Sequence, residues 1–195
     1  MTTTTMKFES PPYRPAAIAQ NGIVAILLFV VTEVMFFAGL ISAFIVTKAG
    51  MVWPPADQPR LPVAATALNT LVLLTSGVAL LKAERAFTEF DSGRTKKMLA
   101  LAIGLGVFFV VFQGYEWVRL IGFGLTMTSS TYGSFFYLIV GAHALHAVAA
   151  LLALSYCAQQ LAHDELTRAA FLTAQIFWYF VVLLWPILYV LVYLL

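Results

Sequence analysis

Five long stretches of apolar residues, separated by short polar segments, dominate the sequence. They cover approximately residues 22–46, 63–81, 98–118, 132–157 and 169–195. A helix needs about 20 apolar residues to cross the hydrocarbon core of a bilayer, because each backbone N–H and C=O must find its partner within the segment. The pattern therefore predicts an all-α membrane protein with five transmembrane helices.

The polar segments between these stretches are short and contain most of the turn-forming and charged residues. The opening segment is polar and proline-rich, and the apolar run that follows it is far too long for a secretory signal. We predict an N-terminal tail over residues 1–20 and a single transmembrane domain over residues 21–195. The sequence has no visible internal repeat, so the inverted-repeat architecture of many transporters has no support here.

Lysine and arginine concentrate on one side of the predicted membrane. Because these residues favour cytoplasmic connections, the bias predicts a cytoplasmic N-terminus and an external C-terminus. The tail and the second and fourth connections carry eight of these residues: Lys7, Arg14, Lys82, Arg85, Arg94, Lys96, Lys97 and Arg168. The opposite side carries three: Lys48, Arg60 and Arg119.

Composition agrees with a bilayer as the main solvent. Hydrophobic residues make up 62% of the 195 positions and charged residues only 10%, whereas soluble domains carry roughly a quarter charged residues. The net charge of +2 is too small and too scattered to indicate a nucleic-acid partner. A single cysteine, Cys157, excludes an intramolecular disulfide and a metal site built mainly from thiolates.

Three ionisable residues fall in the middle of predicted spans: Glu33 in the first, and His143 and His146 in the fourth. Such groups cost several kcal/mol in hydrocarbon unless they are neutral or paired. The two histidines are three residues apart, which places them on one side of a helix, and a hydrogen bond from Glu33 to a histidine is feasible at this shared depth. We predict an intramembrane polar network of these three residues.

A purely structural role and a metal site are the alternatives to a functional network. Polar side chains in membranes often only tie helices together, and we give this interpretation equal weight. Two histidines at this spacing could also share a metal, but haem and copper centres need more ligands than this helix face offers. We therefore expect no catalytic, cofactor-binding or metal-binding residue in this chain.

Further polar residues indicate helix contacts near the same spans. Asn69 belongs to a narrow polar stripe on the second span, and Tyr179 lies on one face of the fifth. In the third span, Gln113, Glu116 and Arg119 follow one another at intervals of three. Because this site is near the external end, Glu116 and Arg119 are predicted to form an interfacial ion pair. Pro186 predicts a kink in the fifth span.

Five motifs together resemble one family, subunit III of cytochrome c and quinol oxidases, from about residue 20 onward. TEVMFF resembles the family's SExMxF motif, and LNTLVLLTSG resembles LNTxxLLxSG. FQGYEW is similar to QxxEW, YGSFF to YGSxF, and GAHALH to GxHxxH. Any one of these motifs is short, but the five occur in the family's order at helix-sized intervals.

The resemblance implies a subunit III-like helical bundle that lacks the first two of the family's seven spans, as in shorter bacterial members. It implies a non-catalytic subunit of a respiratory terminal oxidase in the bacterial cytoplasmic (inner) membrane, with haem and copper held by partner subunits. The implied partners are catalytic subunit I, other oxidase subunits and phospholipid in an interhelical cleft; a larger respiratory supercomplex is a further candidate. The implied roles are to stabilise subunit I and to support proton uptake.

The resemblance also assigns motif positions and shows one departure. Glu33 matches the family's intramembrane glutamate, His143 and His146 its histidine pair, and Glu116 the acid of its third motif. The last family motif, WHFVDxVW, reads WYFVVLLW here, with Tyr179 in the histidine position and Val182 in the acidic one. The polar network is therefore expected to be smaller than in typical members.

Two alternative functions stay open at this point. An accessory subunit of a nitric oxide reductase would use the same helical frame. A small proton-coupled transporter could use Glu33, although the absence of repeats counts against it. The sequence leaves the electron donor open between cytochrome c and quinol.

Overall fold

The computed structural model describes residues 15–50 and 61–194. It contains the helices α1 (Pro15–Ala49), α2 (Val63–Thr88), α3 (Ser92–Gly122), α4 (Thr131–Ala162) and α5 (Arg168–Tyr189), and a π-helical turn at Val190–Leu194. All five α-helices are long and apolar enough to cross a membrane. The five-span, all-α prediction is confirmed for this part of the chain.

Some of the predictions fall outside the described residues. These are most of the predicted tail (1–14) and most of the first connection (51–60), and with them Lys7, Arg14 and Arg60. Where the structure is described, α1 begins at Pro15, inside the segment predicted as tail.

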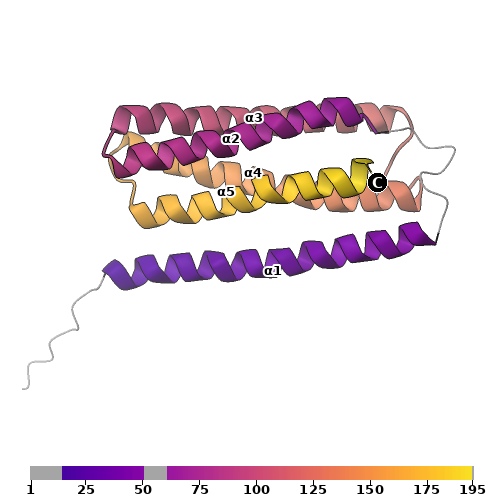
Figure 1. The fold of residues 1–195 in the computed structure, drawn as a ribbon, viewed down its shortest axis with the longest axis horizontal. Coiled ribbons are helices and arrows are strands. Elements are labelled where there is room, and N and C mark those ends of the chain that lie inside the picture. Colours follow the sequence, from indigo (N-terminus) through magenta and orange to yellow (C-terminus); the bar gives the residue numbers. More distant parts are fainter. Residues whose placement is uncertain (1–14, 51–60, 195) are drawn as a thin grey trace, which may run out of the picture.

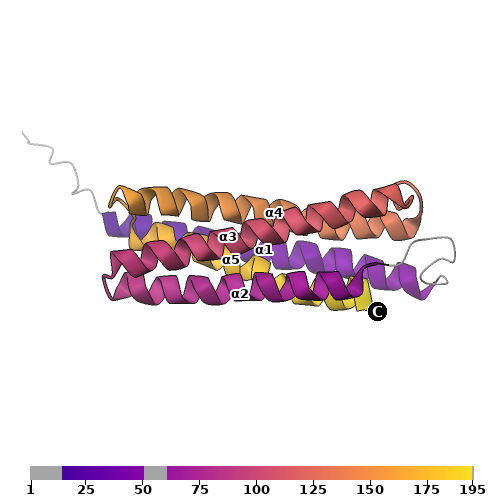
Figure 2. The same cartoon turned by 90° about the horizontal axis from the view of Figure 1, so that it is seen from above.

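The helices lie side by side along the long axis of the molecule and alternate in direction (Figure 1). α2 and α3 pack together on one side, α4 and α5 occupy the middle, and α1 runs along the opposite side against α5 and α4 (Figures 1 and 2). The start of α1 and the end of the chain lie at opposite ends of the bundle (Figure 1). The α2–α3 and α4–α5 connections therefore share one end of the bundle.

Side-chain caps set where three of the helices begin. Asp91 accepts a hydrogen bond from the backbone N–H of Arg94 at the start of α3. Ser130 accepts one from Gly133 at the start of α4, and Thr167 caps α5 in the same way. These caps satisfy N–H groups that lack a partner inside the helix. α2 ends later and α3 begins earlier than the apolar stretches predict, because these helices continue through polar residues beyond the hydrocarbon.

A large aromatic core joins α2, α3, α4 and α5. Trp178 and Trp185 of α5 are fully buried, together with Phe109 of α3 and Phe136 of α4. Gly106 makes this packing feasible, because a Cβ at that position would lie 2.6 Å from the Trp178 ring. The core therefore depends on a small residue facing a large one across the α3–α5 contact.

Candidate functional site

Glu33 and His146 join α1 to α4 in the middle of the bundle. The carboxylate Oε2 of Glu33 lies 2.9 Å from Nε2 of His146. The His146 side chain is 14% exposed and the Glu33 side chain 18% exposed, so neither group faces open solvent. A predicted intramembrane acid thus meets one of the two predicted histidines.

The second ring nitrogen of His146, Nδ1, contacts the backbone of α4. Nδ1 lies 2.7 Å from the backbone carbonyl oxygen of Ala142, one turn earlier in α4. A carbonyl oxygen only accepts hydrogen bonds, so Nδ1 must carry a proton and donate it. The short contact between Nε2 and Oε2 then requires one more proton, held either by the imidazole or by the carboxyl group. In both arrangements the Glu33–His146 pair has no net charge.

Aromatic rings surround this pair. The Phe37 ring lies edge-on to His146 with centroids 5.5 Å apart, and Phe29, Phe177 and Phe180 lie between 6.3 and 6.4 Å from it. These rings come from both α1 and α5 and provide an apolar surrounding. In such surroundings the Glu33–His146 hydrogen bond is stronger than it would be in water.

His143 lies on a different side of α4 and does not contact Glu33 within hydrogen-bond distance. It is 1% exposed, and its ring is tilted against Trp185 with centroids 4.9 Å apart. Neither ring nitrogen has a hydrogen-bond partner among the described residues. The structure therefore brings Glu33 and His146 together and places His143 in a separate environment between α3, α4 and α5.

The polar side of α2, which carries Asn69, Thr70 and Ser76, faces the core. Asn69 is 1% exposed and donates from Nδ2 to the backbone carbonyl of Phe109, 3.1 Å away, which ties α2 to α3. Ser76 Oγ and Thr70 Oγ1 accept hydrogen bonds from the indole N–H groups of Trp178 and Trp185. This side therefore connects α2 to both neighbouring helices.

Sequence reasoning missed the two tryptophan partners of this side of α2. Trp178 and Trp185 are seven residues apart on α5, close to the spacing of six between Thr70 and Ser76 on α2. Spacings of about two helical turns occur on most helices, so these intervals do not identify which residues meet, and the sequence holds no signal for this pairing.

Gln113 lies in the core of α3. It is 4% exposed and donates from Nε2 to the hydroxyl oxygen of Tyr193, 3.0 Å away in the π-helical turn. Its amide oxygen Oε1 has no partner among the described residues. Tyr193 was not predicted as a site residue.

Glu116 and Arg119 form an ion pair at the same end of α3. Nη1 of Arg119 lies 3.2 Å from Oε1 of Glu116. The Glu116 side chain is 4% exposed and that of Arg119 is 49% exposed, so the guanidinium bridges a buried carboxylate to the surface. Such a partner lets an acid lie at the edge of the membrane at low cost.

Tyr179 and Val182 occupy the positions at which the sequence departs from the family pattern. The Tyr179 hydroxyl is buried without a hydrogen-bond partner among the described residues. Val182 packs against α2, where a Cβ on Gly77 would lie 3.2 Å from its Cγ1 atom. An apolar contact between α2 and α5 thus stands where the family pattern has an acid.

The polar groups are too dispersed to form a metal centre of their own. Over residues 15–50 and 61–194, no three His, Cys, Asp or Glu side chains lie close enough together to hold a metal ion. Fold and site thus define a multi-pass helical membrane protein whose intramembrane polar side chains connect helices.

Comparisons with known proteins place this architecture in a family. The family model for cytochrome c oxidase subunit III matches residues 14–195. The chain is 33% identical over 177 residues to cytochrome c oxidase subunit 3 of Petromyzon marinus, covering 86% of this chain and 67% of that protein. It is 33% identical over 179 residues to a probable cytochrome c oxidase subunit 3 of Mycobacterium leprae, covering 87% and 86% of the two chains. A cytochrome c oxidase subunit 3 of Synechocystis is 29% identical over 175 residues, 87% of this chain and 74% of that protein.

The chain belongs to the cytochrome c oxidase subunit III family. It is a subunit III of a terminal oxidase and hence part of a multi-subunit membrane complex. The nitric oxide reductase alternative is not favoured by these relatives.

Proposed function

We propose that this chain is a non-catalytic subunit that stabilises catalytic subunit I, binds phospholipid between its helices and supports proton uptake by the oxidase. The observation that carries the proposal is the Glu33–His146 contact of 2.9 Å in the middle of the bundle. It keeps one transferable proton in apolar surroundings without net charge. It also links α1, the least buried helix, to the rest of the bundle.

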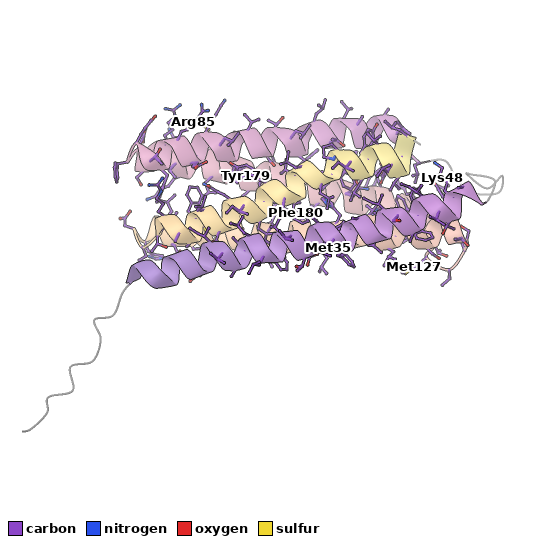
Figure 3. The ribbon with its side chains drawn as sticks, turned by 60° about the horizontal axis from the view of Figure 1, so that its bottom comes forward. Met35, Lys48, Arg85, Met127, Tyr179 and Phe180 are labelled. Atoms are coloured by element: carbon purple, nitrogen blue, oxygen red, sulfur yellow. The ribbon has the colours of Figure 1, made fainter. Side chains whose placement is uncertain are left out.

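A groove between α1 and α5 supports the lipid role. We call it the α1–α5 groove; it has a volume of about 530 Å³ and is lined by Val34 and Phe37 of α1 and Tyr179, Phe180 and Leu183 of α5, among others. Figure 3 shows α5 lying along α1 and labels Tyr179 and Phe180, which line the groove. A mainly apolar groove of this size suits acyl chains.

Charge supports the proposed orientation and location. The first turns of α3 and α5 lie at the same end of the bundle (Figure 1) and carry Arg94, Lys96, Lys97 and Arg168. Placing this end in the cytoplasm follows the usual bias of basic residues and makes the C-terminus external. The bacterial cytoplasmic membrane is the membrane that we propose.

The polar residues divide between two roles in this proposal. Glu33 and His146 serve proton uptake, and His143 is a third intramembrane ionisable residue in a separate environment between α3, α4 and α5. The helix-contact residues Asn69, Gln113, Glu116, Arg119 and Tyr179 hold the bundle in the shape that subunit I binds. Haem and copper belong to the partner subunits.

Purification of the intact oxidase in mild detergent tests the assembly. A tagged chain should retain a haem-containing catalytic subunit, identified by mass spectrometry and by its absorbance spectrum. Purification of the chain without any haem protein, or stoichiometric haem binding by the isolated chain, would contradict the proposal.

Two substitutions at one position separate the structural role from the proton role. Glu33→Gln keeps a hydrogen bond to His146 but removes the transferable proton, so the complex should assemble while proton uptake slows during turnover. Glu33→Leu should impair both. Glu89→Gln, at an exposed position between α2 and α3, is the control and should change neither. Unchanged proton uptake in Glu33→Gln would reject the proton role and leave the assembly role intact.

A further inference from the structure

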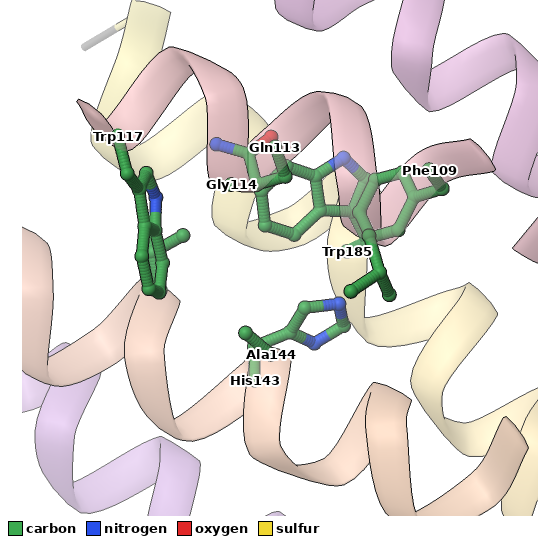
Figure 4. Close-up of a pocket in the computed structure, with 9 residues that line it drawn as sticks. Phe109, Gln113, Gly114, Trp117, His143, Ala144 and Trp185 are labelled. Atoms are coloured by element: carbon green, nitrogen blue, oxygen red, sulfur yellow. The ribbon is translucent and has the colours of Figure 1, made fainter. Parts of the chain in front are cut away.

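A cavity of about 110 Å³ lies between α3, α4 and α5, apart from the Glu33–His146 pair. Its wall is formed mainly by Phe109 and Trp117 of α3, His143 of α4 and Trp185 of α5, and Figure 4 shows these side chains around one space. We call this space the aromatic cavity. Three helices contribute to it, so it is a feature of the assembled bundle rather than of one helix surface.

The wall of the aromatic cavity is almost entirely carbon. The ring nitrogens of His143, Oε1 of Gln113 and Nε1 of Trp117 are covered by neighbouring atoms, so they add almost nothing to its surface. A water molecule is stably buried when it has two to four polar partners, and this wall does not present them. The aromatic cavity therefore favours an apolar occupant.

Contacts to α2 and α3 hold the largest ring of the wall in place. The indole N–H of Trp185 donates to Thr70 of α2 over 2.9 Å, and the Phe109 ring stands edge-on to Trp185 with centroids 5.1 Å apart. Turning the indole into the cavity would break this hydrogen bond inside the membrane, where a lost bond is costly. Gly114 also lines the cavity without a side chain, and a Cβ at that position would meet nothing within 4 Å. The packing of the bundle therefore keeps the cavity open.

Size and access favour a small molecule that arrives from the lipid. Val110 and Gly114 of α3 and Ala144 of α4 are half-buried members of the lining, so the cavity opens between these two helices. Their neighbours Val111 and Leu145 are 66% and 70% exposed, which makes this a lipid-facing side. An engineered apolar cavity of about 150 Å³ in another protein stays dry and binds benzene or xenon. The aromatic cavity is of the same order, and its 110 Å³ is small beside the 530 Å³ of the α1–α5 groove that suits acyl chains.

We propose that the aromatic cavity binds a small apolar molecule from the lipid, of the size class of xenon, and that dioxygen is its occupant in the oxidase. Dioxygen is the electron acceptor of a terminal oxidase, the class of complex to which this chain belongs. It is an apolar diatomic molecule that dissolves better in hydrocarbon than in water, so it reaches the cavity through the lipid. The site holds dioxygen within the complex without any bond or redox step in this chain, and it is independent of the proposed proton role.

Fluorine NMR on the full chain in phospholipid nanodiscs measures whether the aromatic cavity takes an apolar probe. The chain is labelled with fluorotryptophan, and the variants Trp178→Phe and Trp185→Phe assign the two signals. Raising the xenon pressure should shift the Trp185 signal along a saturation curve. Trp178 is equally buried but does not line the cavity, so its signal should shift less and without saturation.

Dioxygen under pressure tests the proposed natural occupant, because it is paramagnetic and speeds the relaxation of nearby fluorine nuclei. Gly114→Leu places a side chain in the cavity and should lower the relaxation enhancement at Trp185 by about threefold or more, because it removes the space for a ligand. Gly104→Leu is the matched control on the same helix. A Cβ there also meets nothing within 4 Å, but Gly104 does not line the cavity, so the enhancement should stay unchanged.

Three results would overturn the proposal. A Trp185 signal that does not shift with xenon would mean that the cavity is closed or already filled, for example by the end of an acyl chain, and this result needs only the unchanged chain. Saturable xenon binding without a relaxation effect of dioxygen at Trp185 would reject dioxygen as the occupant. An equal response to Gly114→Leu and Gly104→Leu would place the dioxygen in the surrounding lipid.

Discussion

α1 and α2 are both apolar enough to cross a membrane but contribute differently to the bundle. Only 6% of the most apolar window of α1 is buried inside the chain, against 44% for α2. α2 is fixed by interhelical hydrogen bonds that Asn69 donates and that Thr70 and Ser76 accept. α1 has the Glu33–His146 contact and the buried rings of Phe37 and Phe44.

This difference shows that hydrophobicity alone does not hold a helix in a membrane protein. Lipid tails solvate an apolar side chain as well as a neighbouring helix does, so association depends on close packing and on polar bonds. α2 has both over its length, and α1 has them at only a few points. We therefore expect substitutions in α1 to lower the free energy of unfolding less than comparable substitutions in α2–α5. The following substitutions test this, from the largest expected loss of stability to the smallest.

The largest loss should follow Trp178→Ala in the bundle. The substitution opens a cavity in the core and removes the hydrogen bond to Ser76, so the free energy of unfolding in mixed micelles should fall by about 3–4 kcal/mol. Phe36→Ala on α1 is the matched aromatic control. Phe36 is 46% exposed, and its removal should change the free energy by less than about 0.5 kcal/mol. Equal losses would erase the distinction between α1 and the bundle.

An intermediate loss of stability is expected when a larger side chain replaces a glycine packed inside α2–α5. A Cβ at Gly106 would lie 2.6 Å from Trp178 and 2.7 Å from Leu151, so Gly106→Val should lower the free energy of unfolding by about 1–3 kcal/mol. The corresponding change on α1, Gly39→Val, meets nothing within 4 Å and should be nearly neutral. The same denaturation experiment compares the two, and a larger loss for Gly39→Val would reverse the comparison.

The polar link of α1 should give a smaller but specific effect. In a double-mutant cycle, Glu33→Leu and His146→Leu should show a coupling energy of about 1–2 kcal/mol, because the contact is short and largely shielded from solvent. Replacing His146 should accordingly cost less in a chain that already carries Glu33→Leu than in the unchanged chain. Purely additive losses would mean that packing by Phe37 and Phe44 alone holds α1.

The smallest change should come from the ion pair at the edge of the bundle. Arg119 is half exposed, so Arg119→Gln should cost about 0.2–1 kcal/mol and the loss should shrink at high salt. Thermal unfolding at low and high salt measures this. A salt-independent loss would indicate that the buried Glu116 carboxylate, rather than the half-exposed Arg119 guanidinium, determines the effect.

The number of spans could be predicted from the sequence because twenty consecutive apolar residues have few other uses. The helix ends could not, since caps such as Asp91 and Thr167 lie in the polar segments, beyond the apolar stretches. Glu33 and the histidines were recognisable because ionisable groups are rare in hydrocarbon.

The sequence alone could not predict that His143 and His146 lie in different environments. Residues three apart differ in direction by about 60° around a helix axis. That angle is enough for His146 to face α1 while His143 faces α3 and α5, as the ring contacts show. Which neighbour each one meets depends on how the other helices are placed, and short motifs do not encode that placement.

The position of the Glu33–His146 pair has an electrical consequence. Both residues lie near the middle of adjacent helices, so a proton passing from one to the other moves sideways within the plane of the bilayer. A membrane potential does work only on charge displaced along the membrane normal. The exchange within the pair is therefore insensitive to voltage, and an energised membrane would neither drive nor oppose it.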